Sequence, residues 1–107
     1  MNQLTSLTDR LQRLLVALER GDHPGRARFE ETLTDGYAWA LKLDAECTRL
    51  ERSIGQLAAH LGAGSNEVEA HQLSNTARQL EDSRRDLHAL RSLLASLRAQ
   101  FAEAKVA

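Results

Sequence analysis

The sequence predicts an all-α protein: a long antiparallel helical hairpin of the coiled-coil type, with a short N-terminal helix packed on its base. Hydrophobic residues make up 42% of the 107 residues but aromatic residues only 4%, so the interior must be built from Leu and Ala. Glycines cluster within residues 21–25 and 62–64, and these two breaks leave three helical segments. The two longer segments carry apolar residues at the alternating spacings typical of a coiled coil. We therefore expect one helical domain over residues 1–107.

The first predicted helix spans residues 3–20 and presents a broad leucine stripe on one face. Such a stripe suits packing against a bundle of helices. Gly21 fits the cap that ends this helix, and Pro24 fits the first turn of the next one. The stripe consists of Leu4, Leu7, Leu11, Leu14, Leu15 and Leu18.

The second predicted helix spans residues 25–61. Thr34-Asp35-Gly36 resembles a turn, and a glycine inside a helix costs about 1 kcal/mol relative to alanine. The heptad nevertheless passes through Gly36 without a change of phase, so we expect one continuous helix. Its core positions are Phe29, Leu33, Gly36, Ala40, Leu43, Cys47, Leu50, Ile54, Leu57 and Leu61.

The third predicted helix spans residues 66–105. Asn66 with Glu69 three positions later resembles a capping box at its start. The heptad then continues for more than four repeats, as in the second helix. Its core positions are Leu73, Thr76, Leu80, Ser83, Leu87, Leu90, Leu94, Leu97, Phe101 and Ala104.

The short second break makes the two long helices antiparallel neighbours, which fixes a register. A turn centred near residue 65 brings small residues opposite large ones, as interdigitating layers require. It also places charges of opposite sign on facing flanks, which would specify the register more than stabilise it. The core pairs include Phe29 with Phe101, Gly36 with Leu94 and Leu43 with Leu87; the charged pairs are Glu30 with Arg98 and Asp44 with Arg84.

Two surfaces are candidates for protein interaction. Near the second break only two helices pack together, and Ala58, Ala70 and Ala77 would let another helix approach their flank closely. The simplest result is a homodimer with a four-helix bundle, although alanine is also a good helix former on a solvated face. At the other end, Trp39 faces Leu93 on a flank where the first helix is expected to dock. Any apolar surface left uncovered near Trp39, Leu41 and Leu93 would form the second candidate.

The chain carries no motif typical of a catalytic or cofactor-binding site. We find no nucleophile–base motif, phosphate-binding glycine loop, paired Cys motif or paired-carboxylate signature, so we expect no enzyme activity, cofactor or metal. His60 and His71 both lie near the second break, but no third ligand accompanies them and a solvated surface is the favoured interpretation. The single Cys47 occupies a core position, which favours a buried hydrophobe over a reactive thiol.

Charge and hydropathy indicate a soluble, cytoplasmic protein. The formal net charge of −1 gives no overall attraction to nucleic acid or acidic lipid. The last helix carries an arginine stripe, but acidic residues interrupt it and no aromatic residues alternate with it, so salt bridges are favoured over nucleic-acid binding. No apolar run reaches the roughly 18 residues of a membrane span, and no signal peptide is visible. The stripe consists of Arg78, Arg84, Arg85, Arg91 and Arg98.

A short amphipathic helix ending in Ala17-Leu18-Glu19-Arg20-Gly21-Asp22, followed by a long hairpin, loosely resembles small flagellar and type III export chaperones. The resemblance covers the first third of the chain and carries no specific motif. The leading functional hypothesis is a non-enzymatic coiled-coil scaffold or adaptor that acts through helix–helix contacts as a homodimer. The alternative is an export-chaperone-like protein that binds a partner's amphipathic helix.

Overall fold

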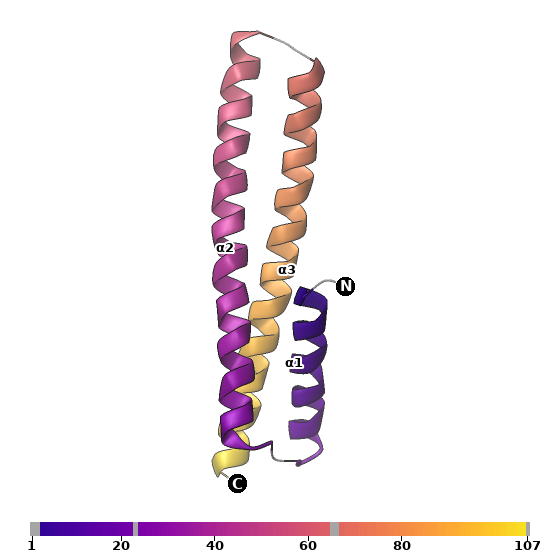
Figure 1. The fold of residues 1–107 in the computed structure, drawn as a ribbon, viewed down its shortest axis with the longest axis vertical. Helices are drawn as coiled ribbons and strands as arrows, with labels where there is room; N and C mark the ends of the chain where they lie inside the picture. Colours follow the sequence, from indigo (N-terminus) through magenta and orange to yellow (C-terminus); the bar gives the residue numbers. More distant parts are fainter. Residues whose placement is uncertain (1–2, 23, 65–66, 107) are drawn as a thin grey trace. The chain divides into compact units, whose positions relative to one another are not determined.

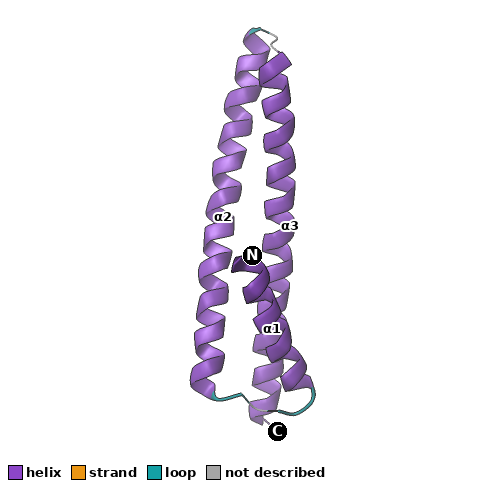
Figure 2. Cartoon of the chain, turned by 45° about the vertical axis from the view of Figure 1, so that its right-hand side comes forward, coloured by secondary structure: helices purple, strands orange, loops and turns teal. Residues whose placement is uncertain are grey.

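The computed structural model describes residues 3–22, 24–64 and 67–106, and these residues form three helices joined by two short connections (Figure 1). The helices are α1 (Gln3–Glu19), α2 (Arg26–Ala63) and α3 (Glu67–Val106). No strand is present in the described ranges. Figure 2, in which strands would be orange, shows only helices and loops there. The predicted all-α fold class, a hairpin of two long helices with a short helix packed on it, is confirmed.

The helix ends follow the glycine positions. Gly21 has a φ of 84°, and two backbone hydrogen bonds close α1 around it: Gly21 N–H donates to Leu18 O at 3.1 Å, and Asp22 N–H donates to Ala17 O at 2.9 Å. This is the Schellman arrangement, which satisfies carbonyls that a helix end otherwise leaves open. Gly36 lies inside α2 with no interruption, as the unbroken heptad predicts. The expected cap residue Asn66 lies outside the described residues.

Contacts within the chain group it into two compact units. The three-helix unit comprises Met1–Leu41 and His88–Ala107, and the two-helix unit comprises Lys42–Leu87. In each unit the α2 and α3 segments are antiparallel neighbours. Only the three-helix unit includes α1.

The core of the three-helix unit confirms the predicted register. The rings of Phe29 and Phe101 stack with their centroids 4.0 Å apart and an interplanar angle of 12°. Gly36 lies directly against the side chain of Leu94. Both pairs are the ones that a turn near residue 65 predicts. The buried apolar residues of this unit are Leu7, Leu11, Leu18, Phe29, Ala40, Leu90, Leu94 and Leu97.

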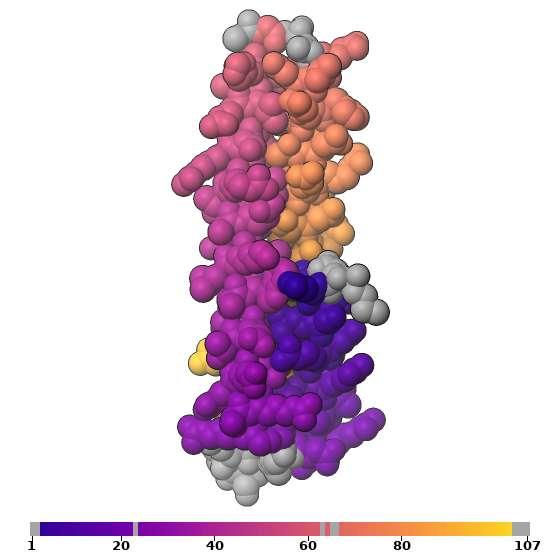
Figure 3. All heavy atoms as spheres, viewed as in Figure 1, coloured from indigo at the N-terminus to yellow at the C-terminus, as the bar shows by residue number. Residues whose placement is uncertain are grey.

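Helix α1 packs on the N-terminal half of α2, as expected (Figure 3). Its direction is antiparallel to α2, because Arg10 Nη2 lies 3.3 Å from Asp35 Oδ2 while Leu7 and Trp39 line the same recess. Thr32 is only 5% exposed, although the sequence analysis did not place it in the core. Its hydroxyl donates to the carbonyl oxygen of Arg28 at 2.9 Å, so this buried polar group is satisfied within its own helix.

The two-helix unit is well buried over only part of its seam. The buried residues of this seam are Leu43, Cys47, Leu50, Leu80 and Leu87. Closer to the connection between α2 and α3, every predicted core position is only half-buried. These half-buried seam residues are Ile54, Leu57, Leu61, Leu73 and Thr76.

The charged partners differ from those predicted. Arg84, expected to face Asp44, donates to Glu51 at 2.9 Å, and Glu30, expected to face Arg98, accepts from Arg26 at 3.0 Å. Helical side chains lean toward the N-terminus of their own helix. In an antiparallel pair this tilt moves Arg84 and Glu51 toward each other and moves Asp44 away from Arg84. The prediction matched backbone positions and did not account for this tilt.

Candidate protein-interaction site

The predicted alanine surface is exposed in the two-helix unit. Ala58 lies on α2, and Ala70 and Ala77 lie on α3. Glu51 is one heptad before Ala58 and Arg84 is one heptad after Ala77, so the Glu51–Arg84 ion pair shares this flank. We call it the alanine flank. It combines small residues with charged ones, and its role in association stays a prediction.

The second predicted surface is divided in the structure. Trp39 and Leu93 are half-buried, whereas Leu41 is 71% exposed. Trp39 lines a recess together with residues at the start of α1, so α1 covers part of the apolar surface expected there. Leu41 and Leu93 do not line this recess. The residues that do are Gln3, Ser6, Leu7, Arg10, Asp35, Ala38 and Trp39.

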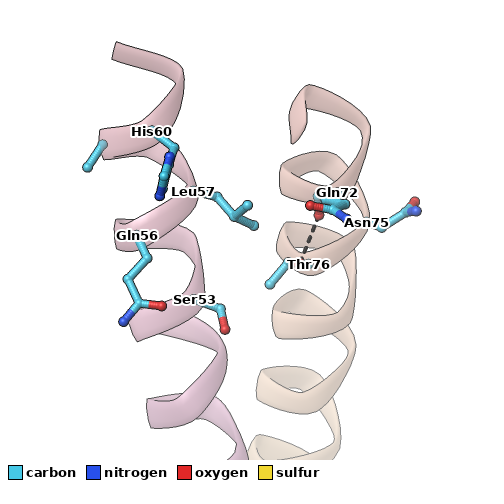
Figure 4. Close-up of a pocket in the computed structure, with 8 residues that line it drawn as sticks. Ser53, Gln56, Leu57, His60, Gln72, Asn75 and Thr76 are labelled. Atoms are coloured by element: carbon cyan, nitrogen blue, oxygen red, sulfur yellow. Dashed lines mark hydrogen bonds between the residues drawn. The ribbon is translucent and has the colours of Figure 1, made fainter. Parts of the chain in front are cut away.

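A groove that the sequence analysis missed lies between α2 and α3 of the two-helix unit (Figure 4). Its half-buried floor consists of Ser53, Leu57 and Thr76, and the other lining residues are exposed. None of the described lining residues is charged, and amide and hydroxyl groups dominate. We call it the amide groove. Its lining residues are Ser53, Gln56, Leu57, Ala59, His60, Gln72, Asn75 and Thr76.

The floor of the amide groove is more apolar than its sequence suggests. Leu57 extends from α2 toward α3 in Figure 4. The hydroxyl of Thr76 donates to the carbonyl oxygen of Gln72 at 2.8 Å, so its hydrogen-bonding capacity is used within α3. Leu57 and the methyl group of Thr76 therefore give the floor apolar surface beside the Ser53 hydroxyl, while the exposed amides of Gln56 and Gln72 supply donors and acceptors around it.

The heptad positions of α2 give a sequence indication of this groove. Ser53 and His60 occupy the heptad position that Thr32 and Trp39 occupy earlier in the same helix. In the three-helix unit, that position lies against α1. Comparing these four positions would have drawn attention to this flank of the two-helix unit.

Cys47 and Glu46 are two titratable groups of the two-helix unit whose surroundings shift their pKa. Burial raises the pKa of the Cys47 thiol, which keeps the thiol protonated at neutral pH. A hydrogen bond from Arg49 lowers the pKa of the half-buried Glu46 carboxyl. His60 and His71 are exposed on different helices. Within the described ranges, no group of three or more His, Cys, Asp or Glu side chains could hold a metal ion.

The arginine stripe of α3 has carboxylate partners. Arg84 pairs with Glu51 across the helices, and Arg85 lies 3.8 Å from Asp82 on its own helix. These ion pairs engage arginine side chains that would have to contact the phosphate backbone of a nucleic acid. They support the salt-bridged interpretation of the stripe.

Among the helices that the structure describes, none combines the length and the apolarity needed to cross a membrane. We found no family model, curated protein or solved structure that matches this chain. The geometry of the two units is therefore the basis for a functional proposal.

Proposed function

We propose that this chain is a non-enzymatic coiled-coil scaffold or adaptor that acts through helix–helix contacts and associates with a second copy of itself. The proposal rests on the five half-buried seam residues of the two-helix unit. They are Ile54, Leu57 and Leu61 on α2, and Leu73 and Thr76 on α3. At these positions the pair of helices leaves the seam partly open, whereas the same pair buries Leu50 and Leu80. Another pair packed on it would complete a four-helix bundle.

The energetic argument rests on apolar area. Full burial of a leucine side chain is worth about 1.5–3 kcal/mol relative to full exposure, so half-buried leucines leave part of this stabilisation unused. Ile54, Leu57, Leu61 and Leu73 are in this state together. Association that covers part of this seam recovers part of that stabilisation, and the length of the seam favours a partner helix over a small ligand.

The residues of the two-helix unit also bear on the cellular location and the partners of the proposed scaffold. Cys47 is a free, buried thiol, which fits the reducing conditions of the cytoplasm. Among the titratable side chains of the two-helix unit, Glu46, Glu51 and Asp82 pair with arginines and Cys47 lies in the core. We therefore propose a cytoplasmic protein whose partners are other helices, with no role in nucleic-acid or membrane binding.

Light scattering coupled to size-exclusion chromatography tests this proposal. We expect the mass of a dimer at tens of micromolar protein, with a shift toward monomer on dilution. A monomeric mass throughout this range would overturn the homodimeric scaffold.

A second function is favoured by the way α1 is attached. Within the described residues, α1 has three buried leucines and one exposed ion pair, Arg10 with Asp35. An amphipathic helix of a partner could replace α1 on α2, as in an export-chaperone-like protein. Deletion of residues 1–21 distinguishes the two roles. A structural α1 predicts loss of thermal stability, whereas a displaceable α1 predicts a stable remainder that binds its partner more strongly.

A further inference from the structure

We propose that the amide groove, and not the alanine flank, is the surface on which a second copy of this chain packs. This inference rests on the proposed homodimer and assigns its interface. It revises the prediction made from sequence, which placed self-association at Ala58, Ala70 and Ala77.

The chemistry of the groove suits contact with an identical surface. In a twofold-symmetric interface a residue near the axis meets its own counterpart in the other copy, so a charged residue there meets the same charge. Charged residues make up 27% of the sequence, yet the described lining of the groove has none. The amides of Gln56, Gln72 and Asn75 each carry both donors and acceptors, so they can pair with copies of themselves.

The shape of the groove suits a helix. Leu57 lies at its centre with half-buried Ser53 and Thr76 beside it, so an approaching side chain meets an apolar floor within a polar rim. This arrangement of an apolar centre and a hydrogen-bonding edge is the one that protein interfaces use. A second copy also supplies two helices at once, matching the two that line the groove.

The heptad positions also favour this flank as the dimer interface. Thr32 and Trp39 hold the position that α1 covers in the three-helix unit. Ser53 and His60 hold the equivalent position in the two-helix unit, where no third helix is found among the described residues. The flank that accepts a helix from the same chain in one unit is thus free to accept one from another copy in the other unit.

The alanine flank is less suited to self-association. Glu51 and Arg84, about half-exposed and joined at 2.9 Å, lie one heptad from Ala58 and Ala77. A second copy packed there would remove this ion pair from water, and desolvation of charges opposes burial. The groove has an ion pair at the same spacing, Glu46 with Arg49, but its described lining residues carry no charge.

Charge substitutions in the groove test the assignment. The double variant Gln56→Glu and Gln72→Glu places like charges on both copies, so we expect its dimer dissociation constant to rise by about tenfold or more. The double variant Gln56→Lys and Gln72→Lys should show the same loss. An equimolar mixture of the two variants should recover a heterodimer, which establishes that each is folded and that repulsion caused the loss. Analytical ultracentrifugation measures all three samples.

The matched control carries Ala58→Glu and Ala77→Glu on the alanine flank, and it should remain a dimer. Dimers that survive the groove substitutions, or Glu and Lys variants that do not recombine, would overturn the groove assignment. If the wild-type chain were monomeric, the proposed function itself would fail, and that result is seen before any variant is made.

Cross-linking gives a second, independent readout. In a Cys47→Ala background, Gln56→Cys should be joined to its counterpart in the other copy by a short bifunctional maleimide. Ala58→Cys in the same background should react far less. Stronger cross-linking at position 58 than at position 56 would place the interface on the alanine flank and overturn the proposal.

Discussion

A Cβ atom placed on Gly36 would lie 2.6 Å from Cδ2 of Leu94, a separation that real side chains do not tolerate. Leu94 is 2% exposed and therefore has little room to move. Gly36 is thus retained inside a long helix because α3 needs the space, although the tripeptide Thr34-Asp35-Gly36 looks like a turn. Close approach of α2 and α3 in the three-helix unit depends on this one missing side chain.

We expect Gly36→Ala to destabilise the protein by about 1 kcal/mol. Overpacking a core costs about 1–3 kcal/mol, and the better helix propensity of alanine returns about 1 kcal/mol. In a Leu94→Ala background the clash is gone, so the same substitution should stabilise by about 1 kcal/mol. Urea unfolding of the four proteins measures both effects. An identical effect in the two backgrounds would show that the two residues are not coupled.

Gly55→Ala is the matched control within the same helix. Gly55 is exposed, and an added Cβ would meet nothing within 4 Å. Only the better helix propensity of alanine then affects stability, so we expect a gain of about 1 kcal/mol in the free energy of unfolding. The same urea titration measures it, and a loss of stability would mean that propensity is not the governing term in α2.

Helix α1 should be held by its leucines and not by its ion pair. Leu11 is fully buried, so Leu11→Ala is expected to destabilise by about 2–5 kcal/mol. Arg10 and Asp35 are about half-exposed, and such ion pairs are worth about 0–1 kcal/mol. Asp35→Asn should therefore lower the melting temperature far less than Leu11→Ala. Comparable losses in thermal unfolding would contradict this ranking.

The sequence predicted the backbone of this fold well because heptad positions are a property of the backbone. The stack of Phe29 on Phe101 and the contact of Gly36 with Leu94 follow from helix period and turn position alone. The partner of Arg84 did not follow, because a long side chain reaches about a turn from its own Cα and its tilt depends on helix direction. Thr32 was missed since its hydroxyl is satisfied within α2, which removes the usual penalty of burying it.

The candidate site was harder to predict than the fold. Small residues such as Ala58 attract attention because they permit close helix approach, whereas Gln56, His60 and Gln72 are commonly found on solvated faces. Their meaning changes only when the structure shows that half-buried Leu57 lies among them and that the lining carries no charge. The register predicted from the sequence pairs backbone positions, but which side chains line one groove together depends on how those side chains pack.

The buried thiol of Cys47 should make stability fall at alkaline pH. Burial raises its pKa in the folded state, so the unfolded chain, with a thiol pKa of about 8.5, releases its proton first. Stability is then fully present below that pH and declines as the pH rises toward the folded-state pKa. Cys47→Ala keeps a small apolar side chain but removes the titration, so its urea midpoint should vary less between pH 7 and pH 9.5 (values chosen to bracket about 8.5). Native labelling by a thiol reagent should also be at least about tenfold slower than labelling in urea. Equal alkaline losses in both proteins, together with fast native labelling, would mean that the thiol is open to solvent.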